Sequence, residues 1–145
     1  MDQKNKNLFE IKDNIIFITG VSGQVGNNLA KLFLENGCKV YGIDKKINKI
    51  RHKKFIFFKQ DITNEKGIKN ILNKIIKIEN KIDVIINNAA VSFFSDILKK
   101  NNKETNLTFN VNLKGVINIT NEYLRIHKKK KLKACRIINI SSIYG

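Results

Sequence analysis

Residues 14–26 read NIIFITGVSGQVG, and this stretch decides the fold. Its first part, NIIFITG (14–20), is a short apolar run closed by glycine, which is the pattern of a β-strand buried on both faces. The next residues form a G-x-x-G-x-x-G arrangement at Gly20, Gly23 and Gly26, and they lead into a helical pattern. A buried strand that passes through a glycine-rich turn into a helix is typical of the start of a parallel α/β sheet.

The rest of the chain repeats this alternation. Four further strands are predicted, at KVYGID (39–44), KFIFFKQD (54–61), KIDVIINNAA (81–90) and ACRIINISS (134–142). Helices are predicted where apolar residues recur at helical spacing, at 23–37, 65–80 and 106–129. The apolar stripe of the first helix consists of Val25, Leu29, Leu32 and Phe33, and that of the second of Ile68, Ile71, Leu72, Ile75 and Ile76.

This order of elements predicts an α/β fold, a Rossmann-like doubly wound parallel sheet with helices on both faces. The sequence has no proline, internal repeat or low-complexity linker, so we expect one domain at 14–145 behind an N-terminal extension at 1–13. The segment 91–105 lacks clear periodicity, and we expect it to be a loop and helix start near the functional site.

The three glycines have separate predicted roles. Gly20 permits the tight turn, Gly23 lets the backbone approach a pyrophosphate, and Gly26 lets the helix pack closely on the strand. The helix that starts here points N–H groups and its positive dipole end at phosphates. We therefore expect this turn to bind a dinucleotide, with contacts that also involve the intervening residues Ser22, Gln24 and Val25.

Asp44 ends the second predicted strand and indicates which dinucleotide is bound. A carboxylate at this position can accept hydrogen bonds from both ribose hydroxyls of the adenosine, and it repels a 2′-phosphate. NAD is therefore the predicted cofactor in preference to NADP. Lys45 and Lys46 leave NADP open, because a cation here could hold the 2′-phosphate; the other interpretation is that both are simply solvated.

Together with these residues, four later motifs resemble the short-chain dehydrogenase/reductase family across almost the whole chain, from Asn14 to Gly145. The motifs are DIT (61–63), NNAA (87–90), FNVNLKG (109–115) and IINISSIYG (137–145). The resemblance implies that Asp61 and Ile62 lie beside the adenine and that Asn88, Ala89 and Ala90 line the cofactor cleft, with Ala90 in place of the family's usual glycine.

The resemblance also implies an activity: hydride transfer between the nicotinamide and a secondary alcohol or ketone. Ser142 would hydrogen-bond the substrate and Asn112 would order a water in a proton relay. A Tyr-x-x-x-Lys motif, in which the Tyr is the general acid/base, normally lies a dozen or so residues after the Ser. The sequence stops three residues after Ser142, and Tyr144 has no Lys four residues on. We therefore expect the N-terminal part of a longer enzyme, truncated after the fifth strand and inactive alone, whose full-length form is a homodimer or homotetramer.

Two branches of the family compete. The glycine spacing, with Gln24 where most small members have glycine, is similar to that of the extended nucleotide-sugar epimerases and dehydratases. NNAA and FNVNLKG are similar to the small oxidoreductases, and the blend resembles a subgroup associated with bacterial surface-sugar and flagellin modification. A sugar or nucleotide-sugar substrate is therefore possible. A third hypothesis is a short protein that binds dinucleotide without catalysing a reaction.

The net charge, the apolar runs and the cysteine spacing indicate which classes of partner and site to expect. The net charge is +16, but its lysines are spread along the chain, and the one cluster, HKKKKLK (127–133), fits a solvated helix end. We therefore expect no nucleic-acid partner. No apolar run is long enough to span a membrane, and Cys38 and Cys135 lack metal-type spacing. We expect no metal site, and free thiols in a reducing cytoplasm.

Overall fold

The computed structural model describes residues 11–93, 99 and 101–142. Expectations for residues 1–10, for 94–98 and 100, and for Tyr144 lie outside the described residues. The strands are β1 (Ile15–Thr19), β2 (Lys39–Asp44), β3 (Phe55–Lys59), β4 (Val84–Asn87) and β5 (Arg136–Asn139). The helices are α1 (Gln24–Glu35), α2 (Glu65–Glu79), α3 (Asn102–Thr108), the π-helix η2 (Phe109–Gly115) and α4 (Val116–Lys130).

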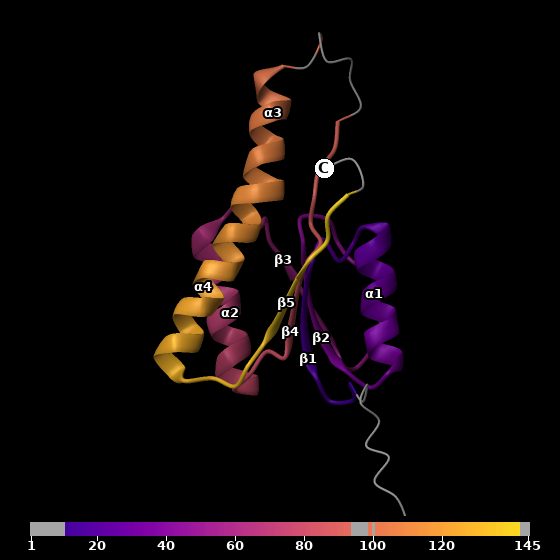
Figure 1. Ribbon diagram of the computed structural model, residues 1–145. Helices are drawn as coiled ribbons and strands as arrows, with labels where there is room; N and C mark the ends of the chain where they lie inside the picture. The colour runs from indigo at the N-terminus through magenta and orange to yellow at the C-terminus, as the bar shows by residue number, and fades with distance from the viewer. Residues whose placement is uncertain (1–10, 94–98, 100, 143–145) are drawn as a thin grey trace, which may run out of the picture.

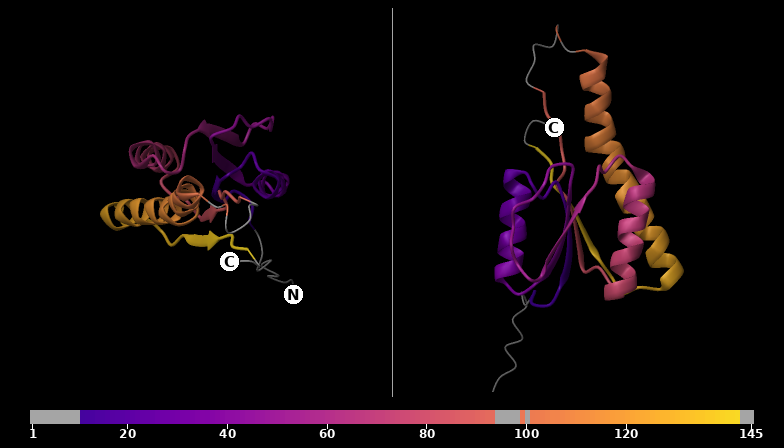
Figure 2. Two further views of the ribbon diagram at one scale, coloured as in Figure 1. Left: turned by 90° about the horizontal axis from the view of Figure 1, so that it is seen from above. Right: turned by 180° about the vertical axis from the view of Figure 1, so that it is seen from behind.

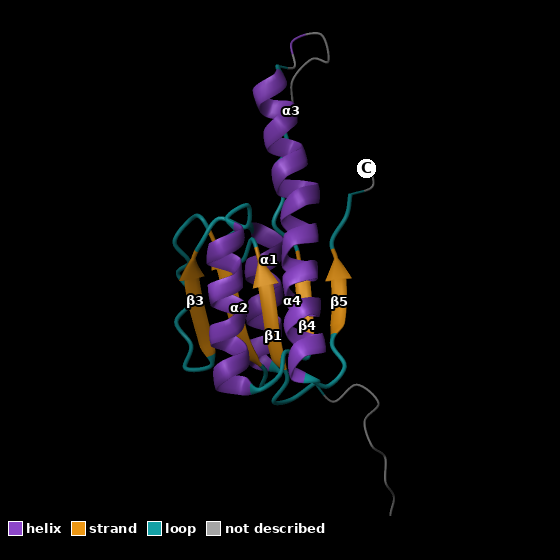
Figure 3. Ribbon diagram, turned by 90° about the vertical axis from the view of Figure 1, so that its left-hand side faces the viewer, coloured by secondary structure: helices purple, strands orange, loops and turns teal. Residues whose placement is uncertain are grey.

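The five strands form one parallel sheet in the order β3-β2-β1-β4-β5, which confirms the predicted doubly wound fold. β1 lies at the centre, where Ile16 pairs with Val40 of β2 and with Val84 of β4. α1 covers one face of the sheet, and α2 and α4 cover the other (Figures 1, 2 and 3). Each face buries its own apolar cluster, so β1, β2 and β4 are enclosed on both sides.

The buried face of α1 differs from the predicted stripe. Its buried residues are Gly26, Ala30 and Leu34. Of the predicted stripe, Leu29 and Phe33 are partly buried against the core, whereas Val25 and Leu32 are each 53% exposed. Small residues four apart let the helix backbone approach the sheet closely, and this approach sets which side of the helix is buried. For α2 the prediction is confirmed, because all five residues of its stripe are buried.

The C-terminal end of α2 is tied to β2 by a polar contact. Glu79 Oε1 accepts hydrogen bonds from Lys39 Nζ and from the Tyr41 hydroxyl. Asn80 then ends the helix in a left-handed conformation, with a φ of 56°. These contacts fix the position of α2 on the sheet.

The predicted helix at 106–129 is longer than expected, because α3, η2 and α4 follow one another directly from Asn102 to Lys130. α3 has no buried residue and extends beyond the sheet (Figure 1). Exposed apolar side chains follow this helical segment at spacings of four and seven residues, at Phe109, Leu113, Ile117 and Leu124.

At the other end of α4, the basic cluster lies where the helix stops at Lys130, and its lysines are exposed. β5 is the last strand of the described sheet, and Ile138 and Ile140 are more than 40% exposed there. Among the described residues, no helix has the length and apolar character needed to cross a membrane.

Candidate functional site: a cavity at the carboxyl ends of the strands

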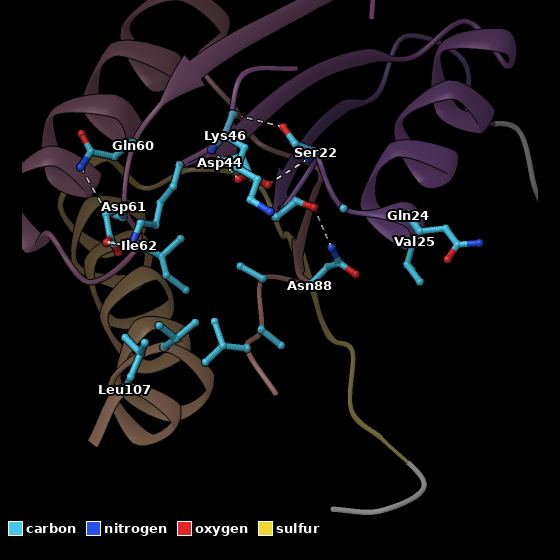
Figure 4. Close-up of a pocket in the computed structure, with 17 residues that line it drawn as sticks. Ser22, Gln24, Val25, Asp44, Lys46, Gln60, Asp61, Ile62, Asn88 and Leu107 are labelled. Carbon is cyan, nitrogen blue, oxygen red and sulfur yellow. Dashed lines mark hydrogen bonds and ion pairs between the residues drawn. The ribbon is translucent and has the colours of Figure 1, made fainter. Parts of the chain in front are cut away.

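A cavity of about 570 Å³ opens beyond the carboxyl ends of β1, β2 and β4 (Figure 4). It is lined by the predicted cofactor residues Gly20, Ser22, Gly23, Gln24, Val25, Asp44, Asp61, Ile62, Asn88, Ala89 and Ala90. Asp61 and Ile62 lie at one side of it and Gln24 and Val25 at the other (Figure 4). Crevices at this edge of a doubly wound sheet are where such folds bind ligands.

Two of the three glycines are required by the space around them. Gly20 has a φ of +67°, and a Cβ there would come within 2.7 Å of the Ala89 Cα. A Cβ on Gly26 would come within 2.4 Å of the Gly20 oxygen, so Gly26 serves the packing of α1 and does not line the cavity. A Cβ on Gly23 would meet only the Gly20 oxygen, at 3.4 Å, so the space in front of Gly23 faces the cavity.

A hydrogen-bond cluster holds the glycine turn against the end of β4. The Asn88 side-chain amide donates to the Thr19 and Gly20 carbonyl oxygens, at 3.0 and 3.2 Å. The buried Thr19 hydroxyl in turn accepts from the backbone N–H groups of Asn88 and Ala89, at 3.0 and 2.9 Å. Thr19 is a contributor that the sequence analysis missed; a hydroxyl at the last position of a buried strand is the signal that could have revealed it.

The tip of β2 is tied to the same turn. The Asp44 carboxylate accepts from the N–H of Ser22 at 3.0 Å and from the N–H of Lys46 at 2.8 Å. The Ser22 hydroxyl donates to the Lys46 carbonyl oxygen, and the buried Asn48 amide donates to the Val21 carbonyl oxygen. The hydrogen bonds from Ser22 and Lys46 therefore hold the Asp44 carboxylate at the rim of the cavity.

Asp61 lies at the tip of β3 with two partners. Its Oδ1 accepts from the backbone N–H and the hydroxyl of Thr63, and its Oδ2 lies 3.1 Å from Lys45 Nζ. Burial by itself would raise the pKa of this carboxyl, but the Thr63 hydrogen bonds and Lys45 together hold it below its ordinary value. Lys45 is therefore paired, in contrast to the interpretation that it is simply solvated.

Asn112 lies in the middle of η2 and does not line the cavity. Its side-chain amide exchanges two hydrogen bonds with the backbone of Val91: Nδ2 donates to the carbonyl oxygen at 2.9 Å and Oδ1 accepts from the N–H at 2.8 Å. Asn112 thus fixes the chain after β4, and its neighbour Val111 lines the cavity. Four lining residues were not named from the sequence: Gln60, Val91, Leu107 and Val111. The available signal for Val111 was an apolar residue directly before the predicted Asn112.

Ser142 follows β5 at the same edge of the sheet, and it is exposed and outside the residues that line the cavity. Of the described tyrosines, neither lines the cavity: the Tyr41 hydroxyl donates to Glu79, and the buried Tyr123 hydroxyl donates to the Ile82 carbonyl oxygen at 3.4 Å. Burial is the main cause that raises the pKa of both phenols. Neither phenol is therefore placed to act as a general acid or base in this cavity.

A model of the family described as short chain dehydrogenase matches residues 14–145. The chain belongs to this family. The short chain dehydrogenase sequences that it resembles include the 3-ketodihydrosphingosine reductase of Bacteroides thetaiotaomicron, to which it is 32% identical over 139 residues, covering 93% of this chain and 49% of that protein.

Solved short chain dehydrogenase structures resemble it as well. One from Leptospira borgpetersenii with bound NAD+ has a TM-score of 0.89 and 32% identity, and the match covers 99% of this chain and 57% of that one. ElxO with bound NADP has a TM-score of 0.79 and 28% identity, over 90% of this chain and 56% of that one. The chain therefore spans about half the length of these relatives.

Among the described residues, no group of His, Cys, Asp and Glu side chains is arranged to hold a metal ion.

Proposed function

We propose that this chain is the dinucleotide-binding part of an oxidoreductase that uses NAD to interconvert a secondary alcohol and a ketone. The observation that carries the proposal is the cavity that the glycine turn and Asp44 share at the edge of the sheet. The space in front of Gly23 can admit the pyrophosphate, because the described residues leave it open. It lies at the N-terminus of α1, where no side chain caps the helix. The N–H groups and dipole of such a helix end suit a pyrophosphate.

The remaining lining residues support a role for each part of the ligand. The Asp44 carboxylate would hold the adenosine ribose, and Asp61 and Ile62 would lie beside the adenine. Asn88, Ala89 and Ala90 would line the path towards the nicotinamide. Bound there, NAD would supply the hydride acceptor, and its reduced form the hydride donor. The family membership supports this assignment, and relatives are described with bound NAD+ and with bound NADP.

Within the whole enzyme we assign Ser142 as the hydrogen-bond donor to the substrate oxygen and Asn112 as the residue that would order a water in a proton relay. The hydrogen bonds to Val91 fix the Asn112 side chain beside the chain after β4. The substrate is proposed as a small alcohol or ketone, which includes sugar-derived ones. The described tyrosines are buried outside the cavity, which supports the expectation that the 145-residue chain binds the dinucleotide without turning substrate over.

We further propose that the full-length form pairs with a second copy through the exposed apolar face of Phe109, Leu113, Ile117 and Leu124. Two free thiols, Cys38 and Cys135, are consistent with a reducing cytoplasmic location.

The test is isothermal titration calorimetry of the purified chain with NAD. We expect saturable binding, and we expect Asp44→Ala to weaken it at least about tenfold, because the variant loses hydrogen bonds to a charged acceptor. Glu35→Gln, which changes an exposed acid at the end of α1, is the matched control and should bind as the original chain does. A folded chain that gives no heat with NAD would contradict the proposal.

A further inference from the structure

Lys45 and Lys46 follow Asp44 at the tip of β2, and Lys45 forms an ion pair. Lys45 Nζ lies 3.1 Å from Asp61 Oδ2, so the ion pair joins the tip of β2 to the tip of β3. Both residues line the cavity beside Asp44. The Lys45 side chain is 65% exposed and that of Asp61 is 32% exposed, so the pair lies at the mouth of the cavity.

The two carboxylates near Lys45 have different partners. Asp44 accepts hydrogen bonds from the N–H groups of Ser22 and Lys46, one on each oxygen. Asp61 has one oxygen directed to Thr63, which leaves Oδ2 for the ammonium group. The Thr63 hydrogen bonds fix the Asp61 carboxylate and, with Lys45, keep its pKa below the ordinary value, so the carboxylate is ionised at neutral pH.

We propose that Asp61 determines cofactor preference by acting through Lys45: the ion pair holds the lysine ammonium away from the position of a 2′-phosphate and so favours NAD over NADP. This proposal rests on the proposed function. A cation at the tip of β2 is the group that a 2′-phosphate needs in order to bind beside a carboxylate. With Lys45 paired to Asp61, a 2′-phosphate would face the Asp44 charge with one cation fewer, because of the two lysines at this tip only Lys46 would be left to meet it.

The test compares NADH and NADPH binding through the fluorescence of the reduced nicotinamide. Asp61→Asn removes the charge and keeps an oxygen that can accept from Thr63. We expect it to raise the affinity for NADPH relative to NADH by about three- to fivefold, in keeping with the strength of an exposed ion pair. Asp61→Asn in a Lys45→Gln background should give no such gain, because the released cation is then absent.

The control is Glu35→Gln, which removes an exposed carboxylate at the end of α1, away from the cavity and the ion pair. It should leave the NADPH-to-NADH ratio unchanged. An equal gain from Asp61→Asn with and without Lys45 would mean that Asp61 repels the phosphate directly, and this result would overturn the proposal. An unchanged ratio in Asp61→Asn would overturn it as well, while NADH binding by the original chain would preserve the proposed function. Absence of binding to either dinucleotide would overturn both.

Discussion

At position 26 the space available is smaller than a methyl group. A Cβ there would lie 2.4 Å from the Gly20 oxygen and 2.7 Å from Asn88 Nδ2, whereas a Cβ at Gly23 would lie 3.4 Å from its nearest neighbour. The sequence predicts separate roles for these two glycines, close helix packing for Gly26 and approach to the ligand for Gly23. It does not predict the neighbour that helps to close the space at Gly26, which is Asn88 from the end of another strand.

This difference gives a paired prediction. Gly26→Ala should lower the free energy of unfolding by about 1–3 kcal/mol, because the backbone of the turn has to move. Gly23→Ala should change it by less than about 1 kcal/mol and yet abolish NAD binding, because the added methyl group faces the cavity. Urea unfolding and calorimetry measure the two effects. Equal stability losses in both variants would contradict the assignment of separate roles.

For other site residues, the sequence predicted which residue lies at the site but not its hydrogen-bond or ion-pair partner. Asp44 and Asp61 both line the cavity, as the strand ends suggested. The partners of Asp61 depend on a turn at Thr63 and on a lysine of a different strand tip, and no periodicity in the sequence encodes that meeting. Asn112 is a further example: it lies in the π-helix η2 and binds the backbone of Val91, 21 positions earlier, and no sequence spacing encodes this contact.

Among the elements, α2 shows how a helix is held at its end as well as along its face. Its apolar stripe follows directly from the sequence, since five isoleucine and leucine side chains at helical spacing are all buried. The link from Glu79 to Lys39 and Tyr41 joins residues about 40 positions apart and has no sequence signature. The buried side of α1 was predicted only in part: Leu29 and Phe33 pack against the core, but the fully buried positions include the small residues Gly26 and Ala30.

The Glu79 link predicts a pH dependence of stability. Burial would raise the pKa of Glu79, but Lys39 and Tyr41 lower it below the ordinary value of 4.5. A carboxyl with a lowered pKa in the folded state stabilises the fold above its unfolded pKa, and this contribution is lost as the pH falls through the folded value. Glu79→Gln should therefore cost about 1–3 kcal/mol at pH 7, and much less at about pH 3.

Urea unfolding of the original chain and of Glu79→Gln between pH 7 and pH 3 measures how the cost of the substitution changes with pH. Glu35→Gln, an exposed substitution at the end of α1, is the control and should unfold like the original chain over the whole range. A cost for Glu79→Gln that stays constant with pH would show that the carboxylate charge is not the stabilising group.

For the whole molecule, the parallel sheet was the part most accessible from the sequence, because both the order of the elements and the apolar strands indicate it. The sequence predicts one long helix at 106–129, but not its earlier start at Asn102 or the π-helical turn η2 within it. This segment carries a row of exposed apolar side chains, and such a surface usually marks an interaction site.

The proposed pairing predicts that this face controls association. In the full-length form, Leu113→Lys and Ile117→Lys should each shift the protein towards the monomer, as measured by sedimentation velocity over a range of concentrations, because a buried unpaired charge opposes contact. The control is Ile78→Lys, which changes an equally exposed isoleucine on α2. If all three variants associate like the original chain, the apolar face does not mediate pairing.

The hydrogen bonds that join Thr19, Gly20 and Asn88 have a consequence for the speed of ligand capture. Because folding has already ordered the turn that receives the phosphates, this turn does not have to rearrange before a dinucleotide can bind to it. Capture should then be a single diffusional encounter whose observed rate rises linearly with ligand concentration. The net charge of +16 should accelerate the approach of an anion, and this acceleration should fade as salt is added.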